Sequence, residues 1–395
     1  MSDLLSERIN KLSTSQTLAM AALARELKAQ GKDIISLSLG EPDFNTPDFV
    51  KEAAKKAIDE NYSQYTPVDG YAELKEAISK KFKRDNNLDY SPSQIVVSTG
   101  AKQSLFNVAQ VVLNPGDECI LPAPFWVSYS EIVKMCDAVP VEVPTTIEND
   151  FKITPQQLEA AITPRTKMIM FSSPCNPSGS VYNRHELTAL ARIVAQHQQI
   201  VVVSDEIYEH INFSGNFCSF ASIPGMFDRT VTVNGVSKAF AMTGWRIGYI
   251  GAPEYIAKAC TKMQGQITSG ANSIAQRATI AAVSAQPSQL KYMVDEFHKR
   301  RDLVVGLLRE IDGIKVNVPE GAFYVFPDVS EFFGKTLRGT LIRNADDFSM
   351  YLLAEAAVAT VTGDAFGNPD CIRLSYATSE NLLIEALRRI KEALS

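Results

Sequence analysis

The chain has 395 residues, which suits about two or three domains, or one large domain and one smaller. Apolar residues make up 45% of the chain and charged residues 21%, which are ordinary values for a globular protein. The net charge of −6 is spread over both signs without a basic tract. Composition therefore gives no support to nucleic-acid binding or to a role at a membrane surface.

The sequence has no feature typical of export, membrane insertion or metal binding. Residues 1–16 carry charges where a secretory signal needs an apolar run, so we expect no signal peptide. No apolar run reaches the length of about 18 residues that a transmembrane helix needs. The six cysteines are scattered without a C-x-x-C pair, and the four histidines lack metal-ligand spacing. We therefore expect reduced thiols, a cytoplasmic location and no metal site.

Most of the chain alternates predicted strands and helices. An amphipathic helix is predicted near 17–30, ahead of the segment DIISLSLGEPDF. Short β-branched runs bounded by turn residues then predict strands at 94–99, 118–123, 139–144, 167–173, 199–206 and 230–235. Predicted helices lie between most of them and include 101–113 and 184–197. Near-continuous apolar strands with helical crossovers indicate a mostly parallel sheet that is covered on both faces.

The C-terminal part has a different pattern. A long charged helix is predicted near 288–312, followed by VNVPEGAFYVFPDV and by a final helix in SENLLIEALRRIKEAL. We assign both chain ends to a smaller α+β domain. Residues 1–45 are predicted to form an N-terminal arm and part of this small domain, 46–285 the large domain, and 286–395 the C-terminal part of the small domain.

Two basic residues stand in a stretch that otherwise reads as protein interior, VTVNGVSKAFAMTGWRIGYI. Lys238 and Arg246 are of types that are rarely buried without a partner. The predicted strand–helix turn at Gly100 and Ala101 leaves free backbone N–H groups that favour an anion such as phosphate. Many helix starts of this kind are only caps. The planar guanidinium of Arg246 suits either such an anion or a buried carboxylate.

Polar residues also follow two of the predicted strands. Asp205 ends the strand at 199–206, with Tyr208 three residues later, and Asn176 lies between two prolines in SSPCNPSG. Open α/β sheets bind ligands at the carboxyl ends of their parallel strands. Asp205 is equally compatible with a helix N-cap, and the loop around Asn176 with an ordinary turn.

Taken in order, these motifs closely resemble those of the class I/II aminotransferases, which are pyridoxal-phosphate (PLP) enzymes of fold type I. SSPCNPSG, VSDEIYEH and NGVSKAFAMTGWRIGY carry the resemblance, and GEPDF, GAFYVF and IRLSYA extend it to both chain ends. The resemblance implies an α/β fold whose large domain has a mostly parallel mixed sheet between helices, beside a smaller α+β domain. It also implies bound PLP and a homodimer whose active sites form at the subunit interface.

The same resemblance implies a role for each candidate residue. Lys238 would form the internal aldimine with PLP and move the proton in a ping-pong transamination, because an amine in an apolar site loses its proton easily. Asp205 would face the pyridine nitrogen, and Tyr208 and Asn176 would bond the 3-oxygen of the ring. Trp126 would stack on the ring face.

Phosphate binding is implied for a further set of residues: Gly100, Ala101, Lys102, Ser237, Arg246 and, from the neighbouring subunit, Tyr65. Gly235 stands where many relatives carry a phosphate-binding serine, so that hydrogen bond is either lost or supplied by Ser237. Ser173 and Ser178 also depart from the common pattern, away from the implied chemistry.

Substrate binding is implied for Arg373, which would hold the α-carboxylate together with Gly40, Asn176 and Trp126. For a second carboxylate, Lys102 is the candidate cation, unless it is an exposed lysine that contributes only its backbone N–H. Relatives that accept prephenate or aromatic amino acids depend on basic residues near the N-terminus. This chain has Lys11 nearby but Ser13 where some of those relatives carry a basic residue.

The expected reaction is aspartate plus 2-oxoglutarate to oxaloacetate plus glutamate, because the branch motifs are most similar to those of bacterial aspartate aminotransferases. The alternatives are an aminotransferase for prephenate or aromatic amino acids, and an elimination reaction such as that of a C–S lyase, because fold does not fix function. A non-catalytic regulator is a further alternative, but it would need a DNA-binding module for which the chain has no spare segment. Domain closure over the substrate is also expected.

Overall fold

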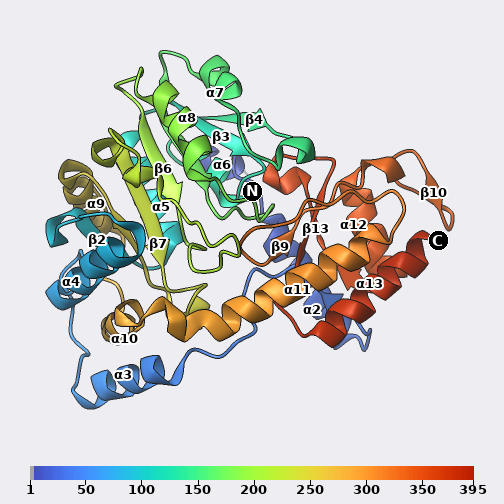
Figure 1. The fold of residues 1–395 in the computed structure, drawn as a ribbon, viewed down its shortest axis with the longest axis horizontal. Coiled ribbons are helices and arrows are strands. Elements are labelled where there is room, and N and C mark those ends of the chain that lie inside the picture. Colours follow the sequence, from blue (N-terminus) through green and yellow to red (C-terminus); the bar gives the residue numbers. More distant parts are fainter. Residues whose placement is uncertain (1–3) are drawn as a thin grey trace.

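A seven-stranded sheet forms the centre of the larger part of the computed structural model, which describes residues 4–395 (Figure 1). Its strands lie in the order β2-β8-β7-β6-β5-β3-β4. Their bounds are β2 (Ile95–Ser98), β3 (Glu118–Ala123), β4 (Val139–Pro144), β5 (Thr166–Ser172), β6 (Val201–Asp205), β7 (Thr230–Gly235) and β8 (Gly248–Gly251).

The sheet is mixed but mostly parallel, as the sequence predicts. β8 runs antiparallel to both of its neighbours, β2 and β7. The remaining neighbours pair in parallel, for example β5 with β6 through Met168 opposite Val201 and Ser172 opposite Asp205. The predicted strands lie within about two residues of their observed bounds, and β8 is the strand of this sheet that the sequence did not predict.

Helices cover both faces of this sheet, which explains its continuous apolar strands. Alternate residues of β5 point to opposite sides: Met168 and Met170 belong to one buried cluster, and Ile169 and Phe171 to another. The first face is covered by α5 (Ala101–Val112), α6 (Ser128–Lys134) and α9 (Glu254–Ile267). The other is covered by α3 (Asp48–Asp59), α4 (Ala72–Lys81), α7 (Pro155–Ala161), α8 (Arg184–Val194) and α10 (Ser273–Ser284).

The two chain ends meet beside this sheet. Strand β1 (Ile35–Ser36) pairs in parallel with β12 (Val358–Ala359). A three-stranded antiparallel sheet has the order β13-β14-β9, and β10 and β11 form a hairpin. The bounds are β9 (Tyr324–Val325), β10 (Thr336–Leu337), β11 (Thr340–Leu341), β13 (Val361–Thr362) and β14 (Ile372–Ser375). The domain boundaries near 45 and 285 stay a prediction.

The longest helix of this second part is α11 (Lys291–Arg309), which runs from beside the large sheet to α12 and α13 (Figure 1). The others are α1 (Glu7–Asn10), α2 (Gln16–Ala29), α12 (Ala345–Glu355) and α13 (Glu380–Leu394). The predicted helix at 288–312 begins later than expected, because Pro287–Leu290 forms a 3-10 turn. α13 begins where the Ser379 side chain caps the Leu382 N–H.

The structure of residues 4–395 bears on two expectations from composition, one about membrane-spanning helices and one about disulfides. Within that range, no helix combines the length and the apolar character needed to cross a lipid bilayer. The six cysteines all lie in the same range, and none of them forms a disulfide.

Candidate active site

A cavity of about 320 Å³ opens at the carboxyl ends of the parallel strands. Because β3, β5, β6 and β7 run in the same direction, the residues that follow them meet at one edge of the sheet. Eleven of the residues singled out from the sequence line this cavity: Gly40, Ala101, Lys102, Trp126, Asn176, Asp205, Tyr208, Ser237, Lys238, Arg246 and Arg373.

Two of the predicted residues lie elsewhere. Gly100 lies beside the cavity, at the N-cap of α5. Tyr65 is 99% exposed in the single chain and does not reach the cavity, so its contact with the phosphate depends on a second subunit and stays a prediction.

Lys238 follows β7 and points its amine across the cavity. Its Nζ donates a hydrogen bond of 2.6 Å to the Gly40 carbonyl, which belongs to the N-terminal segment. Burial lowers the pKa of Lys238 to about 8, and repulsion from Arg373 adds to the effect. Loss of one proton near neutral pH turns this amine into a nucleophile and a base.

Asp205 lies at the end of β6 and is buried. Tyr129 of α6 donates a hydrogen bond of 2.8 Å to its Oδ2, and the Ile207 N–H donates one of 3.2 Å to its Oδ1. Burial raises the pKa of Asp205 to about 6, although the Tyr129 hydrogen bond opposes the rise. A cationic group placed against this carboxylate would favour its ionised form. Tyr129 is a contact that the sequence did not predict.

Tyr208 faces the same cavity from the turn after β6. Its hydroxyl lies 2.7 Å from that of Tyr324 in β9, and both rings are buried. Burial and the neighbouring Tyr324 raise the pKa of Tyr208 well above its usual value, so the phenol keeps its proton at neutral pH. Tyr324 lies in the GAFYVF motif, yet nothing in its spacing indicates that it meets Tyr208, 116 residues away.

Arg373 is fully enclosed, with 1% of its surface exposed. Its Nη1 donates to Asn176 Oδ1 at 2.9 Å, and its Nη2 donates to the Ser38 carbonyl at 2.6 Å. The Tyr324 ring lies 4.6 Å from the guanidinium carbon. Its Nε has no hydrogen-bond partner among residues 4–395. An unpartnered charged donor beside a cavity is suited to a carboxylate supplied by a ligand.

The start of α5 offers a place for an anion. The first N–H groups of a helix lack partners within the helix, and here they open beside Arg246. A Cβ at Gly100 would overlap the Arg246 guanidinium, so only glycine lets the cation approach this closely. The Arg246 Nη1 also bonds the Thr243 carbonyl at 2.7 Å, which holds the side chain toward the helix.

Lys102 and Trp126 lie together in the lining of the cavity. The Lys102 amine stands 4.8 Å from the centre of the Trp126 ring. Burial and repulsion from Arg246 lower the pKa of Lys102. Lys102 also borders a second cavity of about 660 Å³, lined on one side by Ser13 and its neighbours. Lys102 therefore lines both cavities, whereas Arg373 lines only the smaller one.

Fold and site together define an α/β enzyme that combines a half-buried lysine, an anion site at a helix start and an arginine suited to a carboxylate. Residues 32–390 match the family described as aminotransferase class I and II, and the chain belongs to this family. It is therefore an aminotransferase of fold type I, as its motifs predict.

Individual relatives match the chain over nearly its whole length. An aspartate/prephenate aminotransferase of Cereibacter sphaeroides is 49% identical over 390 residues, covering 98% of each chain. A bifunctional aspartate aminotransferase and glutamate/aspartate-prephenate aminotransferase of Petunia hybrida is 48% identical over 395 residues, covering 99% of this chain and 82% of its own. The crystal structure of the Rhizobium meliloti aspartate aminotransferase aligns with a TM-score of 0.96 at 46% identity, covering 99% of this chain and 98% of that one.

Proposed function

We propose that this enzyme binds PLP and transfers the amino group of aspartate to 2-oxoglutarate, giving oxaloacetate and glutamate. The observation that carries the proposal is the cavity in which Lys238, Asp205 and Arg373 meet. The names of its relatives support aspartate as the donor, among them an aspartate aminotransferase of Bacillus subtilis that is 46% identical over 391 residues.

The donor set of the cavity fits PLP. An aldehyde needs a neutral amine, and Lys238 has a pKa of about 8. A protonated pyridine nitrogen needs a carboxylate, which Asp205 supplies, and Tyr208 offers a phenol to the neighbouring ring oxygen. A phosphate needs cations and N–H donors, which Arg246 and the start of α5 supply together with the Ser237 hydroxyl. Trp126 provides an aromatic face for the ring.

Gly235 lies in a tightly packed place at the end of β7. A Cβ there would lie 3.0 Å from Ile207 Cδ1 and 3.0 Å from the Ile247 carbonyl oxygen. A serine at this position would therefore need its neighbours to move. We propose that Ser237, which lines the cavity, supplies the missing hydroxyl.

Each of these residues has a separate role in the proposed reaction. When bound, PLP supplies an electron sink for the charge left on the substrate Cα. The Lys238 amine takes the proton from that Cα and gives it up again within the same half-reaction. Arg373 holds the α-carboxylate with Asn176 and the backbone near Gly40. Trp126 limits the space beside the substrate, which keeps water from the reacting carbon.

We also propose a cytoplasmic homodimer in which Tyr65 of each copy reaches the cofactor of the other. The 99% exposure of Tyr65 supports an interface at this position. Leu4, Leu5 and Ile9 in the N-terminal arm are likewise exposed, as expected for an arm that packs on a second copy. The absence of disulfides among the described residues supports a reducing compartment.

Closure of residues 1–45 and 286–395 over the large domain is part of the same proposal. Gly40 and Arg373 come from the small part, whereas Lys238 and Asn176 come from the large one, and they already contact each other in pairs. A dicarboxylate bound between them would favour closure. Identical arrangements of the two parts with and without a dicarboxylate inhibitor would contradict it.

Prephenate is a second candidate for the amino acceptor, supported by the names of several relatives and by the size of the cavity beside Lys102. Relatives named aspartate/prephenate aminotransferase include that of Nitrosomonas europaea, which is 47% identical over 397 residues. The cavity of about 660 Å³ beside Lys102 has room for an acceptor larger than 2-oxoglutarate, although Ser13 in its lining supplies no basic group.

An absorbance spectrum of the PLP-loaded protein before and after addition of L-aspartate tests the proposed function. Loss of the near-visible band with formation of the pyridoxamine spectrum is expected with L-aspartate, and a weaker response with L-phenylalanine. A response to phenylalanine alone would move the assignment to aromatic substrates. Release of ammonia and pyruvate from L-cysteine would indicate a lyase, and a protein that binds no PLP would refute the proposal.

Removing the Lys102 amine is expected to weaken dicarboxylic substrates selectively. In Lys102→Met the KM for aspartate should rise about 10- to 100-fold, because a hydrogen bond to a charged group contributes about 1.5–3 kcal/mol. The KM for phenylalanine should change little, because it has no second carboxylate. Steady-state kinetics with both donors checks this. Equal changes for the two donors would show that Lys102 contributes only to cofactor binding.

A further inference from the structure

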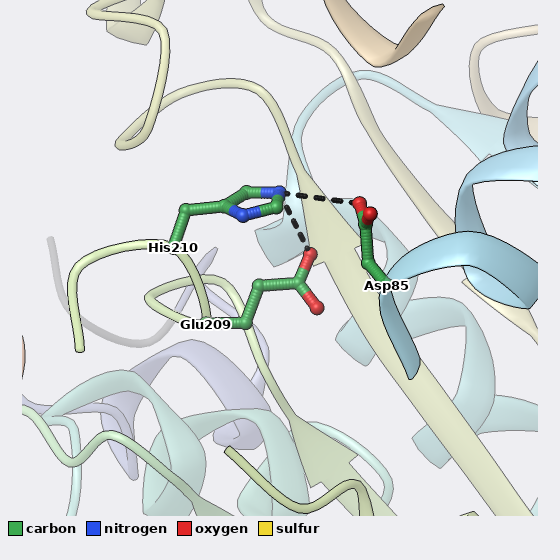
Figure 2. Close-up of side chains that lie close together, drawn as sticks. All are labelled: Asp85, Glu209 and His210. Atoms are coloured by element: carbon green, nitrogen blue, oxygen red, sulfur yellow. Dashed lines mark ion pairs between the residues drawn. The ribbon is translucent and has the colours of Figure 1, made fainter. Parts of the chain in front are cut away.

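A second group of buried charges lies behind the turn that carries Asp205 and Tyr208. Asp205 and Tyr208 face the cavity, whereas Glu206 and Glu209 do not line it. Glu206 is 1% exposed and Glu209 is 6% exposed, so both carboxyl groups are enclosed by protein. Figure 2 shows Glu209 and His210 directed toward Asp85, which belongs to a different part of the chain.

Glu209 is paired with a buried lysine. The amine of Lys81, at the end of α4, donates a hydrogen bond to Glu209 Oε1, and both side chains are at most 3% exposed. Asn86 joins the same pair: its Oδ1 accepts from Lys81 at 2.8 Å and its Nδ2 donates to Glu209 Oε2 at 2.6 Å. Burial opposes ionisation, yet Lys81 and His210 hold the pKa of Glu209 at about 2. We call Lys81, Asn86 and Glu209 the rear triad.

The rear triad connects two irregular segments. A π-helical turn covers Phe82–Asn86, so Lys81 comes just before it and Asn86 is its last residue. The two side chains lie on the same side of this turn and contact each other. Glu209 lies in residues 206–211, which form a turn after β6 rather than a helix or a strand. The Glu206 side chain holds the other end of this turn through the hydroxyls of Ser204 and Ser219, at 2.9 and 2.7 Å.

A metal ion is a weaker explanation of this cluster. Asp85, Glu209 and His210 each offer an atom within 4.8 Å of the others. The Lys81 ammonium, however, bonds the same Glu209 Oε1 that lies 3.3 Å from His210 Nε2. A divalent cation there would face a buried ammonium at close range. Lys81 already supplies the positive charge that balances the carboxylates of Glu209 and Asp85.

Stability alone also explains the rear triad poorly. Removing two charges from water costs several kcal/mol per ion, and apolar residues of similar volume are often as stabilising as a buried ion pair. Buried charged groups do fix geometry, because their hydrogen bonds are directional. The geometry in question is that of the active-site turn: the Ile207 N–H bonds the Asp205 carboxylate, and Tyr208 directly precedes Glu209.

We propose that the rear triad, Lys81, Asn86 and Glu209, positions the active-site turn and thereby sets where the Asp205 carboxylate and the Tyr208 hydroxyl stand. This inference rests on the proposed function for Asp205 and Tyr208. None of the three residues lines the cavity, so they act through the turn and are positioning residues.

An apolar triad separates positioning from stability. Lys81→Met/Asn86→Leu/Glu209→Leu removes the whole triad at once. Asp85 loses Lys81 but keeps Arg84, and His210 loses Glu209 but keeps Asp85 at 3.7 Å. The melting temperature should therefore stay within a few degrees of the original. The backbone amides of residues 206–211 should nevertheless exchange their hydrogens about tenfold faster in the cofactor-free protein. The kcat with aspartate should fall about 10- to 100-fold with little change in KM, because Arg373 is untouched.

A control variant and a second measurement make the test specific. Lys75 also lies on α4 but pairs with Asp69, so Lys75→Met removes an ion pair from the same helix and should leave exchange at 206–211 and kcat unchanged. The pH midpoint of the near-visible band of PLP-loaded protein should move in the apolar-triad variant and in Tyr208→Phe. A variant that carries both sets of changes should show little further movement of the midpoint.

An apolar-triad variant with the original exchange rates and pH midpoint would overturn the proposal. A parent protein that binds no PLP would refute the proposed function, while the exchange rates would still decide whether the triad holds the turn.

Discussion

Lys238→Ala is expected to lower the rate of transamination by about 10⁴-fold. The variant lacks the amine that we propose attaches to the cofactor aldehyde and takes the proton from the substrate Cα. Its near-visible absorbance should therefore differ from that of the parent protein, and single-turnover mixing with aspartate should give almost no pyridoxamine product. A variant that keeps both the band and the half-reaction would contradict the assignment of Lys238.

The site of attachment can be located independently of activity. Borohydride treatment of PLP-loaded protein should fix the cofactor to the peptide that contains Lys238, which mass spectrometry detects. Lys258→Ala is the matched control, because the Lys258 side chain is 73% exposed and pairs with Glu254 on its own helix. Since burial lowers the pKa of Lys238 to about 8, attachment to cofactor-free protein should accelerate as pH rises through 8. No such acceleration is expected below about pH 6.

The parallel strands could be predicted from sequence because each is a short apolar run between turn residues. Strand β8 could not, since it reads Gly-Tyr-Ile-Gly, and glycine weakens a strand pattern. The structure explains both glycines: a Cβ at Gly248 would overlap the Ala101 backbone, and one at Gly251 would overlap the Tyr90 ring. The sequence signal was lost where the backbone of β8 has to approach its neighbours closely.

In the candidate site, too, some residues could be predicted from the sequence and others could not. Residues at strand ends, such as Asp205 and Lys238, could be located because parallel strands bring their carboxyl ends together. Tyr129 and Tyr324 could not, because each reaches the site from a separate element and its partner is far away in the sequence. Lys81 and Glu209 are 128 residues apart, and each resembles an ordinary charge on a helix or in a loop. Long-range pairing between polar residues leaves no periodic pattern to detect.

The opposite orientation of neighbouring residues in the turn after β6 links the two clusters. Asp205 and Tyr208 face the cavity, while Glu206 and Glu209 are enclosed behind it. Burial raises the pKa of Glu206 to about 8, whereas Lys81 and His210 help to hold that of Glu209 at about 2, against the effect of burial. One short segment therefore carries both the groups assigned to the chemistry and the groups that hold them in place.

Arg373→Lys is expected to raise the KM for aspartate and for 2-oxoglutarate by about 100-fold, which corresponds to about 3 kcal/mol. Lysine carries the same charge but lacks the planar fork, so it cannot bond Asn176 and the Ser38 carbonyl while presenting a donor to a carboxylate. Steady-state kinetics with both substrates measures the change. Arg343→Lys is the control, because Arg343 pairs with Asp347 on the exposed surface of α12 and should leave both KM values unchanged.

An amine without an α-carboxylate distinguishes carboxylate binding from a general disturbance of the site. If Arg373 acts on the α-carboxylate, such an amine should react equally slowly with the parent protein and with Arg373→Lys, because neither has a carboxylate to hold. If the substitution instead displaced Asn176 or Tyr324, both of which contact Arg373, the variant should be slower with this amine too. Equal rates with the amine and a large difference with aspartate would together assign the α-carboxylate to Arg373.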